Sequence, residues 1–168
     1  MRIDPRRAGW RPVAAAVAVV ALLACGFGGS READEPPAAE QSLPDPCTLL
    51  TPAEVAEVQG GPTDPGTPAT GTSPNEPGCV FGQTNDGKVT TITVFAGGQA
   101  RFAGDREVVA DNFDVEDIAG LGDAAFIGAS VLYVRKGELI ITLFTGSPTP
   151  EEQRDKALKL APKALARL

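Results

Sequence analysis

The sequence predicts an α+β domain in which helices cover a mainly antiparallel sheet of about five strands. Two observations lead to this class. The expected strands come in pairs joined by short turns, at residues 79–95 and 131–145, whereas parallel strands need a long crossover connection. Segments with helix-start signals lie at both ends of this run of strands, and a strand–helix–strand alternation is absent from the pattern.

The first helix is expected to begin after Thr51. The Thr51 side chain can cap a helix, Pro52 suits the first helical position, and Glu54 completes a capping box. Gly60 is a typical residue just beyond a helix end. From there to residue 78 the chain is rich in Gly, Pro and Thr, so we expect a flexible loop over residues 60–78.

Five strands and two more helices are expected in the rest of the domain. Asn85-Asp86-Gly87 is a typical hairpin turn, and Lys136-Gly137 occupies the corresponding place in a second hairpin. Residues 139–144 are apolar on both faces, which predicts a central strand. The strands are expected at residues 79–83, 88–95, 117–127, 131–135 and 138–145, and the helices at residues 99–112 and from Thr149 to the end. The strand at residues 117–127 is expected to be broken by Gly120 and Gly122.

The N-terminus has the organisation of an export signal. Four arginines precede an apolar run at residues 13–23, which is too short to cross a bilayer but long enough for a signal-peptide core. The run ends in Ala24-Cys25, which resembles the bacterial lipobox. We therefore expect residues 1–24 to be a lipoprotein signal peptide and Cys25 to carry the lipid, palmitate included, that anchors the protein to the membrane.

The chain behind Cys25 divides into a tether and one domain. Residues 25–45 are rich in Gly, Ser, Ala, Glu and Pro and lack apolar periodicity, which predicts a disordered tether. Residues 46–168 are expected to form a single α+β domain. This organisation places the domain outside the cytoplasm, on the outer face of the cell membrane.

Two cysteines remain once Cys25 is assigned to lipid. An even pair in an exported domain is most simply a disulfide, so Cys47 and Cys79 are expected to bond and to hold the N-terminal helix against the first strand. The alternative is a redox or metal-binding pair. The two residues lack the Cys-x-x-Cys spacing of such sites, and the chain has no His to share in binding a metal.

The charge balance narrows the range of partners. The chain has 15 basic and 22 acidic residues, and without residues 1–24, which hold four arginines and one aspartate, it has 11 basic and 21 acidic residues and a net charge of −10. Such a surface repels nucleic acid and gains nothing from anionic lipid headgroups. Membrane attachment is therefore expected through the lipid on Cys25.

Few residues suggest catalytic or metal chemistry. The absence of His removes the commonest general base, so neither a catalytic residue nor a cofactor is predicted. Gly120-Leu121-Gly122-Asp123-Ala124-Ala125 matches a loose dinucleotide-binding pattern, but a strand rather than the required helix is expected after it, which favours a turn. An acidic cluster is a weak candidate for Ca²⁺ binding, with a solvated turn as the alternative: Asp111, Asp114, Glu116 and Asp117.

Three of these segments together resemble a family of actinobacterial lipoproteins with a domain of unknown function. They are the opening Cys47-Thr48-Leu49-Leu50-Thr51, the pair Cys79-Val80-Phe81, and the Gly-Leu-Gly-Asp turn that begins at Gly120. The chain has Phe81 where Trp is common in that family. The family is similar to compact α+β envelope domains of the photosystem-assembly (PsbP-like) type. The resemblance implies a ligand- or partner-binding role and supplies no catalytic residues.

These expectations combine into a first functional hypothesis. The protein is expected to be a non-catalytic binding module of the cell envelope, with an envelope protein, a glycolipid or a small molecule as its partner. One alternative is an envelope hydrolase or transferase that uses carboxylates, which requires Asp or Glu side chains to converge in a cleft. Another is an accessory subunit of a transporter or sensor.

Overall fold

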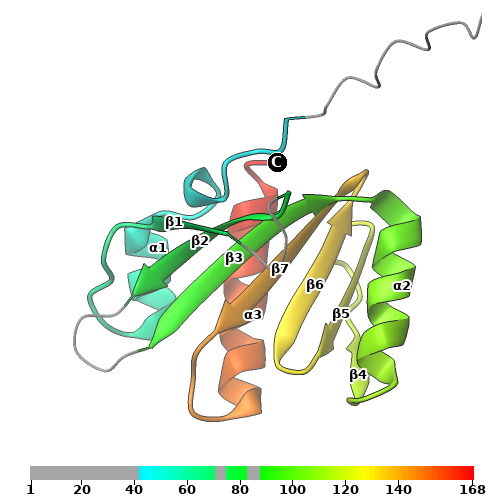
Figure 1. The fold of residues 1–168 in the computed structure, drawn as a ribbon. Coiled ribbons are helices and arrows are strands. Elements are labelled where there is room, and N and C mark those ends of the chain that lie inside the picture. The colour runs from blue at the N-terminus through cyan, green and yellow to red at the C-terminus, as the bar shows by residue number, and fades with distance from the viewer. Residues whose placement is uncertain (1–41, 71–74, 83–87) are drawn as a thin grey trace, which may run out of the picture. The chain divides into compact units, whose positions relative to one another are not determined.

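The computed structural model describes residues 42–70, 75–82 and 88–168, all within the compact unit Glu40–Leu168. The predicted signal peptide, Cys25 and most of the predicted tether lie outside the described residues. The unit contains one seven-stranded antiparallel sheet, with the strand order β1-β2-β3-β7-β6-β5-β4 (Figure 1). Its strands are β1 Thr67–Thr70, β2 Pro77–Gly82, β3 Val89–Ala96, β4 Val115–Asp117, β5 Ala124–Gly128, β6 Val131–Lys136 and β7 Leu139–Thr145, and its helices are the 3₁₀ turn η1 Pro46–Thr48, α1 Pro52–Gln59, α2 Gly98–Ala110 and α3 Pro150–Leu165.

The predicted α+β class and antiparallel sheet are confirmed, but the prediction of about five strands is wrong. The expected loop over residues 60–78 contains β1, which pairs with β2 and includes Pro68. A proline is tolerated there because β1 is an edge strand. The segment at residues 117–127, counted as one strand with a break at Gly120 and Gly122, forms two separate strands, β4 and β5, because these glycines have φ of 76° and 60°.

The main core lies between one face of the sheet and the helices α1 and α3. Alternate residues of the strands point to this face, as expected from the two-residue repeat of a strand. Its fully buried members include Phe81, Ile92 and Leu143 from the sheet, Val55 from α1 and Leu160 from α3. The apolar residues of α3 therefore face the core.

Helix α2 packs on the opposite face of the sheet, over β5, β6 and the ends of β3 and β7 (Figure 1). A second and smaller core holds it there. Phe102 of α2 contacts Phe126 edge-on at 5.2 Å between ring centroids, and Phe126 stacks on Tyr133 at 4.5 Å. Phe95 and Ile140 complete this cluster. The sheet is therefore covered by helices on both faces, but only in part on the α2 side.

The predicted disulfide is present. The Cys47 and Cys79 sulfur atoms lie 2.09 Å apart, and Cys79 is completely buried. The bond joins η1 to β2 and so anchors the chain just before α1 begins at Pro52. The cross-link therefore acts on the segment next to the N-terminal helix rather than on the helix itself.

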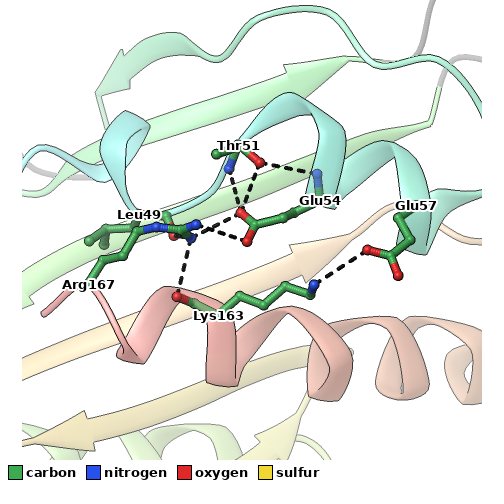
Figure 2. Close-up of polar contacts among 6 residues, drawn as sticks. All are labelled: Leu49, Thr51, Glu54, Glu57, Lys163 and Arg167. Carbon is green, nitrogen blue, oxygen red and sulfur yellow. Dashed lines mark hydrogen bonds and ion pairs between the residues drawn. The ribbon is translucent and has the colours of Figure 1, made fainter.

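A capping box at the start of α1 is also bound by the end of the chain (Figure 2). The Thr51 hydroxyl accepts from the Glu54 backbone N–H at 3.2 Å, and the Glu54 carboxylate accepts from the Thr51 N–H at 2.9 Å. Arg167 donates to both oxygens of the same carboxylate, at 2.9 and 3.0 Å, and to the Leu49 carbonyl at 2.8 Å. The hydrogen bonds from Arg167, assisted by those from Thr51, outweigh partial burial and lower the pKa of Glu54 to about 2.

We expect Arg167→Met to lower the free energy of unfolding by about 1–2 kcal/mol at pH 7, the size of a charged, partly exposed hydrogen-bonded pair. The pKa of Glu54 falls from 4.5 to about 2 on folding, so this contribution is complete above pH 4.5 and is lost as the pH falls to 2. Urea unfolding of both proteins between pH 2 and pH 7 checks this, because the gap between the two curves must close at the acidic end.

The same pair of helices supplies a matched control. Lys163 and Glu57 form a second ion pair between α3 and α1 at 3.4 Å, with the Glu57 side chain 71% exposed (Figure 2). Because solvent screens this pair, Lys163→Met is expected to change the free energy of unfolding by less than about 0.5 kcal/mol. Equal losses in the two variants would show that Arg167 contributes no more than a surface charge.

Candidate functional site

The α2 side of the sheet carries a polar and aromatic surface beside the helix. In β3, Thr91 and Thr93 alternate with the buried Ile92 and Val94, so the threonines project toward the α2 side while their neighbours enter the main core. This alternation is a direct consequence of the sequence. It places two hydroxyl groups on a part of the sheet that α2 does not cover completely.

The antiparallel register extends this surface across three adjacent strands. Thr93 of β3 lies opposite Thr142 of β7, which in turn lies opposite Tyr133 of β6. One pair further along, Thr91 lies opposite Phe144, and Phe144 lies opposite Val131. Side chains directly opposite each other in antiparallel strands are close neighbours. The sheet therefore presents two continuous rows of half-buried side chains from β3 to β6.

A cavity of about 370 Å³ lies between these rows and α2. We call it the α2 cavity. Threonine hydroxyls and the Tyr133 phenol supply polar groups, aromatic rings and valines supply apolar walls, and charged residues stand at the helix side. Its lining residues are Glu76, Thr91, Thr93, Phe95, Arg101, Asp105, Val108, Val109, Val131, Tyr133, Thr142 and Phe144.

Three charged side chains at the cavity form one network around Arg101. Its guanidinium donates to Glu76 at 3.0 Å and to both oxygens of Asp105 at 2.9 and 3.1 Å. The Arg101 Cζ atom also lies 4.8 Å from the centroid of the Phe95 ring, within the range of a cation–π contact. Asp105 lies one helical turn after Arg101, so α2 itself sets this part of the geometry.

Tyr133 is the one phenol in the chain, and it is held in a fixed orientation. Its ring stacks on Phe126, with 8° between the planes. Burial, and to a lesser degree the negative charge of Asp105, raise the pKa of Tyr133 above its ordinary value of 10. The phenol therefore keeps its proton at neutral pH and can donate a hydrogen bond in the cavity.

The composition of the lining is suited to binding an amphipathic molecule. Ligand sites are commonly concave and mostly apolar, with a few polar groups that fix the orientation of the ligand. Here the valines and aromatic rings provide contact area, and the hydroxyls of Thr91, Thr93 and Thr142 each offer a donor and an acceptor. The carboxylates of Glu76 and Asp105 are bound to Arg101, so they hold the guanidinium in place.

Two of the four residues in the acidic cluster considered for Ca²⁺ are paired with arginines. Asp117 forms a two-bond pair with Arg106 of α2, and Glu116 forms one with Arg154 of α3. Within residues 42–70, 75–82 and 88–168, no group of three or more His, Cys, Asp or Glu side chains is placed to hold a metal ion. Asp117 and Glu116 instead link β4 to α2 and α3.

Asp114 and Glu116 line a second hollow of about 410 Å³ at the end of the sheet, together with the turn between β5 and β6 and the start of α3. Ala129 and Ser130 form that turn with φ of 52° and 64°, the conformation of a type I′ hairpin. Arg154 lies in the hollow and is paired with Glu116. This arrangement leaves the α2 cavity as the better candidate for a ligand site.

The Gly-Leu-Gly-Asp segment is a structural turn. No helix follows it, because β5 begins at Ala124. Gly122 has a φ of 60°, and a side chain there would lie 2.4 Å from the Arg135 carbonyl oxygen, so glycine is required. The Asp123 carboxylate accepts from the Gly137 N–H at 2.7 Å and from Arg135 at 3.2 Å, which ties the turn to the β6–β7 hairpin.

Comparison with known proteins adds no further constraint, since no family model, curated protein or solved structure matches this chain. The α2 cavity was not anticipated from the sequence. The alternating threonines of β3 were its only local signal, since Arg101, Asp105, Thr142 and Phe144 come together through the sheet register and the packing of α2.

Proposed function

We propose that the protein is a lipid-anchored, non-catalytic binding module of the cell envelope, and that the α2 cavity is its ligand site. The observation that carries the binding role is the cavity itself, where rows of hydroxyl and aromatic side chains face a helix that bears a fixed charged network. Its volume of about 370 Å³ lies in the range of small-molecule sites. The carboxylates of Glu76 and Asp105 both form ion pairs with Arg101, which favours ligand binding over a catalytic role for these carboxylates.

The anchor is proposed from the N-terminal sequence. The four arginines, the apolar run at residues 13–23 and Ala24-Cys25 occur in the order of a lipoprotein signal. Among the described residues no helix is long and apolar enough to span a bilayer. The Cys47–Cys79 disulfide supports an oxidising location outside the cytoplasm. Two acyl chains on Cys25 are enough for stable attachment.

The resemblance to actinobacterial lipoproteins of the photosystem-assembly (PsbP-like) type belongs to the same proposal. It is supported by the short motifs at Cys47, Cys79 and Gly120, which in the structure form η1, β2 and the turn before β5. A lipid-anchored domain of this kind would present its ligand site on the outer face of the membrane.

Native mass spectrometry of the protein released from its own envelope tests the proposal. The expected mass is that of a chain starting at Cys25 with at least two acyl groups, one disulfide and a retained small ligand. Thr142→Trp fills the centre of the α2 cavity and is expected to lose the ligand. Ala53→Trp adds the same side chain at an exposed position of α1, beyond the opposite face of the sheet, and is expected to retain it.

Three results would contradict the proposal. An unacylated mature chain with free thiols at Cys47 and Cys79 would contradict the proposed location in the cell envelope. A wild-type protein without any bound ligand would contradict the proposed binding role. Equal ligand retention in Thr142→Trp and wild type would place the binding site outside the α2 cavity.

A further inference from the structure

We propose that the α2 cavity binds a small molecule with a hydroxyl head and a hydrocarbon tail, and that it binds this molecule in one orientation. This inference rests on the proposed function and names the ligand class of the same site. The volume of about 370 Å³ is near the lower end of ligand sites, which suits one compact molecule. Hydroxyl and apolar side chains are distributed unequally along α2, and this distribution determines the class and the orientation of the ligand.

The hydroxyl end of the cavity lies beside the first half of α2. Three hydroxyl groups of one row of the sheet stand there, those of Thr93, Thr142 and Tyr133, and we call them the hydroxyl row. The Tyr133 ring stacks on Phe126, which in turn contacts Phe102 in the second turn of α2. The packing of α2 therefore fixes the place of the hydroxyl row along the helix.

Threonines on the two faces of the sheet differ in their partners. On the main-core face, Thr90 accepts from a glutamine side chain of α1 at 2.8 Å, and Thr145 donates to a backbone carbonyl of α3 at 2.9 Å. In the part of the chain that the structure describes, no residue forms a hydrogen bond with a member of the hydroxyl row. Each member can both donate and accept, as the hydroxyl head of a ligand also can.

The apolar end of the cavity lies beside the second half of α2. The next row of the sheet contributes Phe144 and Val131 there, and the helix contributes Val108 and Val109. The position of this row along α2 is fixed by Gly128, which lies opposite Val131, since a side chain at this glycine would lie 2.4 Å from Val109. The character of the lining therefore changes from hydroxyl to apolar along the helix.

Val108 extends the apolar end to the surface. It lines the cavity and is 66% exposed, one of two exposed large apolar residues among the described ones. Thr91, the remaining member of the second row, lies on β3, two strands away from β6. A hydrocarbon tail placed between Val108, Val131 and Phe144 removes this apolar surface from water, which favours binding.

The reverse orientation is unfavourable for the same molecule. It would place the hydroxyl head among valines, where the head loses its hydrogen bonds to water without gaining others. It would also place hydrocarbon against the hydroxyl row and so deprive three further groups of hydrogen-bond partners. The two ends of the cavity therefore select one orientation.

Three probes test the inference on the full chain at pH 7: n-hexanol, n-butanol and a hexanediol with a hydroxyl group at each end. Binding is followed by NMR shifts of the valine and threonine methyl groups of the cavity. We expect n-hexanol to bind about tenfold more tightly than n-butanol, at about threefold for each added methylene. The diol is expected to bind about tenfold more weakly than n-hexanol, because its second hydroxyl enters the apolar end.

Nuclear Overhauser contacts between probe and protein test the orientation directly. For bound n-hexanol, we expect the terminal methyl group to contact the methyl groups of Val108 and Val131. The methylene group that bears the hydroxyl is expected to contact the methyl groups of Thr93 and Thr142. Contacts in the opposite sense would overturn the orientation.

Substitutions of matched shape separate the two ends. Thr142→Val removes a hydroxyl and should weaken n-hexanol about fivefold, and Thr142→Ser should regain most of this loss. Val131→Thr adds a hydroxyl at the apolar end and should reduce the preference for n-hexanol over n-butanol to about threefold or less. General structural damage would weaken both alcohols alike and leave this preference unchanged. Thr67→Val, at an exposed position of β1 outside the lining, should alter neither quantity.

The outcomes separate this inference from the proposed function. If the diol binds as tightly as n-hexanol, and Thr142→Trp abolishes the binding, the cavity is a ligand site but the proposed ligand class is wrong. If n-hexanol binds wild type and Thr142→Trp equally, the site lies elsewhere. If no probe binds while envelope-purified protein retains a ligand that Thr142→Trp loses, the proposed function stands and this inference is overturned.

Discussion

Phe126→Ala is expected to lower the free energy of unfolding by about 3–5 kcal/mol, the range for truncating a buried phenylalanine. Phe126 is completely buried and contacts two aromatic rings, Phe102 at 5.2 Å and Tyr133 at 4.5 Å. Its removal leaves a void under α2 and takes away both aromatic pairs, each of which contributes about 0.5–1.5 kcal/mol beyond buried area. Urea unfolding followed by circular dichroism measures the loss.

The control for this prediction is Phe113→Ala. Phe113 follows α2 and is 56% exposed, so the same change of side chain is expected to cost less than about 0.5 kcal/mol there. Similar losses in the two variants would contradict the packing of α2 on the sheet. Because α2 forms one wall of the α2 cavity, Phe126→Ala is also expected to lower the affinity of the cavity for its ligand, whereas Phe113→Ala is expected to leave that affinity unchanged.

Replacing both Cys47 and Cys79 by alanine is expected to lower the free energy of unfolding by about 3–4 kcal/mol. The bond spans a sequence separation of 32 residues, and opening it restores the freedom of that loop in the unfolded chain. The loop contains α1 and β1, which are otherwise held by the pairing of β1 with β2, by the burial of Val55 in the main core and by the ion pairs of α1 with α3. The measurement is urea unfolding of the double variant and of wild type under oxidising conditions.

The reduced wild-type protein provides the first control, since it must lose about as much stability as the double variant if the bond itself is responsible. Cys25→Ala provides the second control. We propose that Cys25 carries lipid rather than a disulfide, so this variant is expected to unfold at the same urea concentration as wild type when both lack lipid. A loss of stability in Cys25→Ala would show that the three cysteines are divided differently.

Local hydrogen-bond patterns explain why the helix starts were predicted correctly. Thr51 and Thr149 each accept from a backbone N–H three residues later, at 3.2 Å in both cases, and Pro52 and Pro150 occupy the first helical positions. These contacts join residues only three positions apart in sequence, so their pattern can be recognised without knowledge of the fold. The second helix was also located, since residues 99–112 were expected and α2 spans Gly98–Ala110.

The strand count was wrong where pairing depends on distant residues. β1 contains Thr, Pro and Ala and has no apolar alternation, and it is a strand because β2 offers it an edge to pair with. The stabilisation that β1 gains from pairing with β2 cannot be inferred from the residues of β1 alone. The connection between β5 and β6 was expected at residues 128–130, but its turn type was not predicted, since Ala129 and Ser130 adopt the left-handed conformation that sequence patterns assign to glycine or asparagine.

The sequence by itself determined the α+β class, the starts of the first and last helices and the pairing of Cys47 with Cys79. Each follows from spacing along the chain or from a count of cysteines. Only the tertiary structure decided that α2 covers part of one sheet face, and that its Arg101 and Asp105 meet the threonine and aromatic rows there. The physical reason is that this meeting depends on strand register and on the packing of Phe102 against Phe126, which are interactions between distant segments.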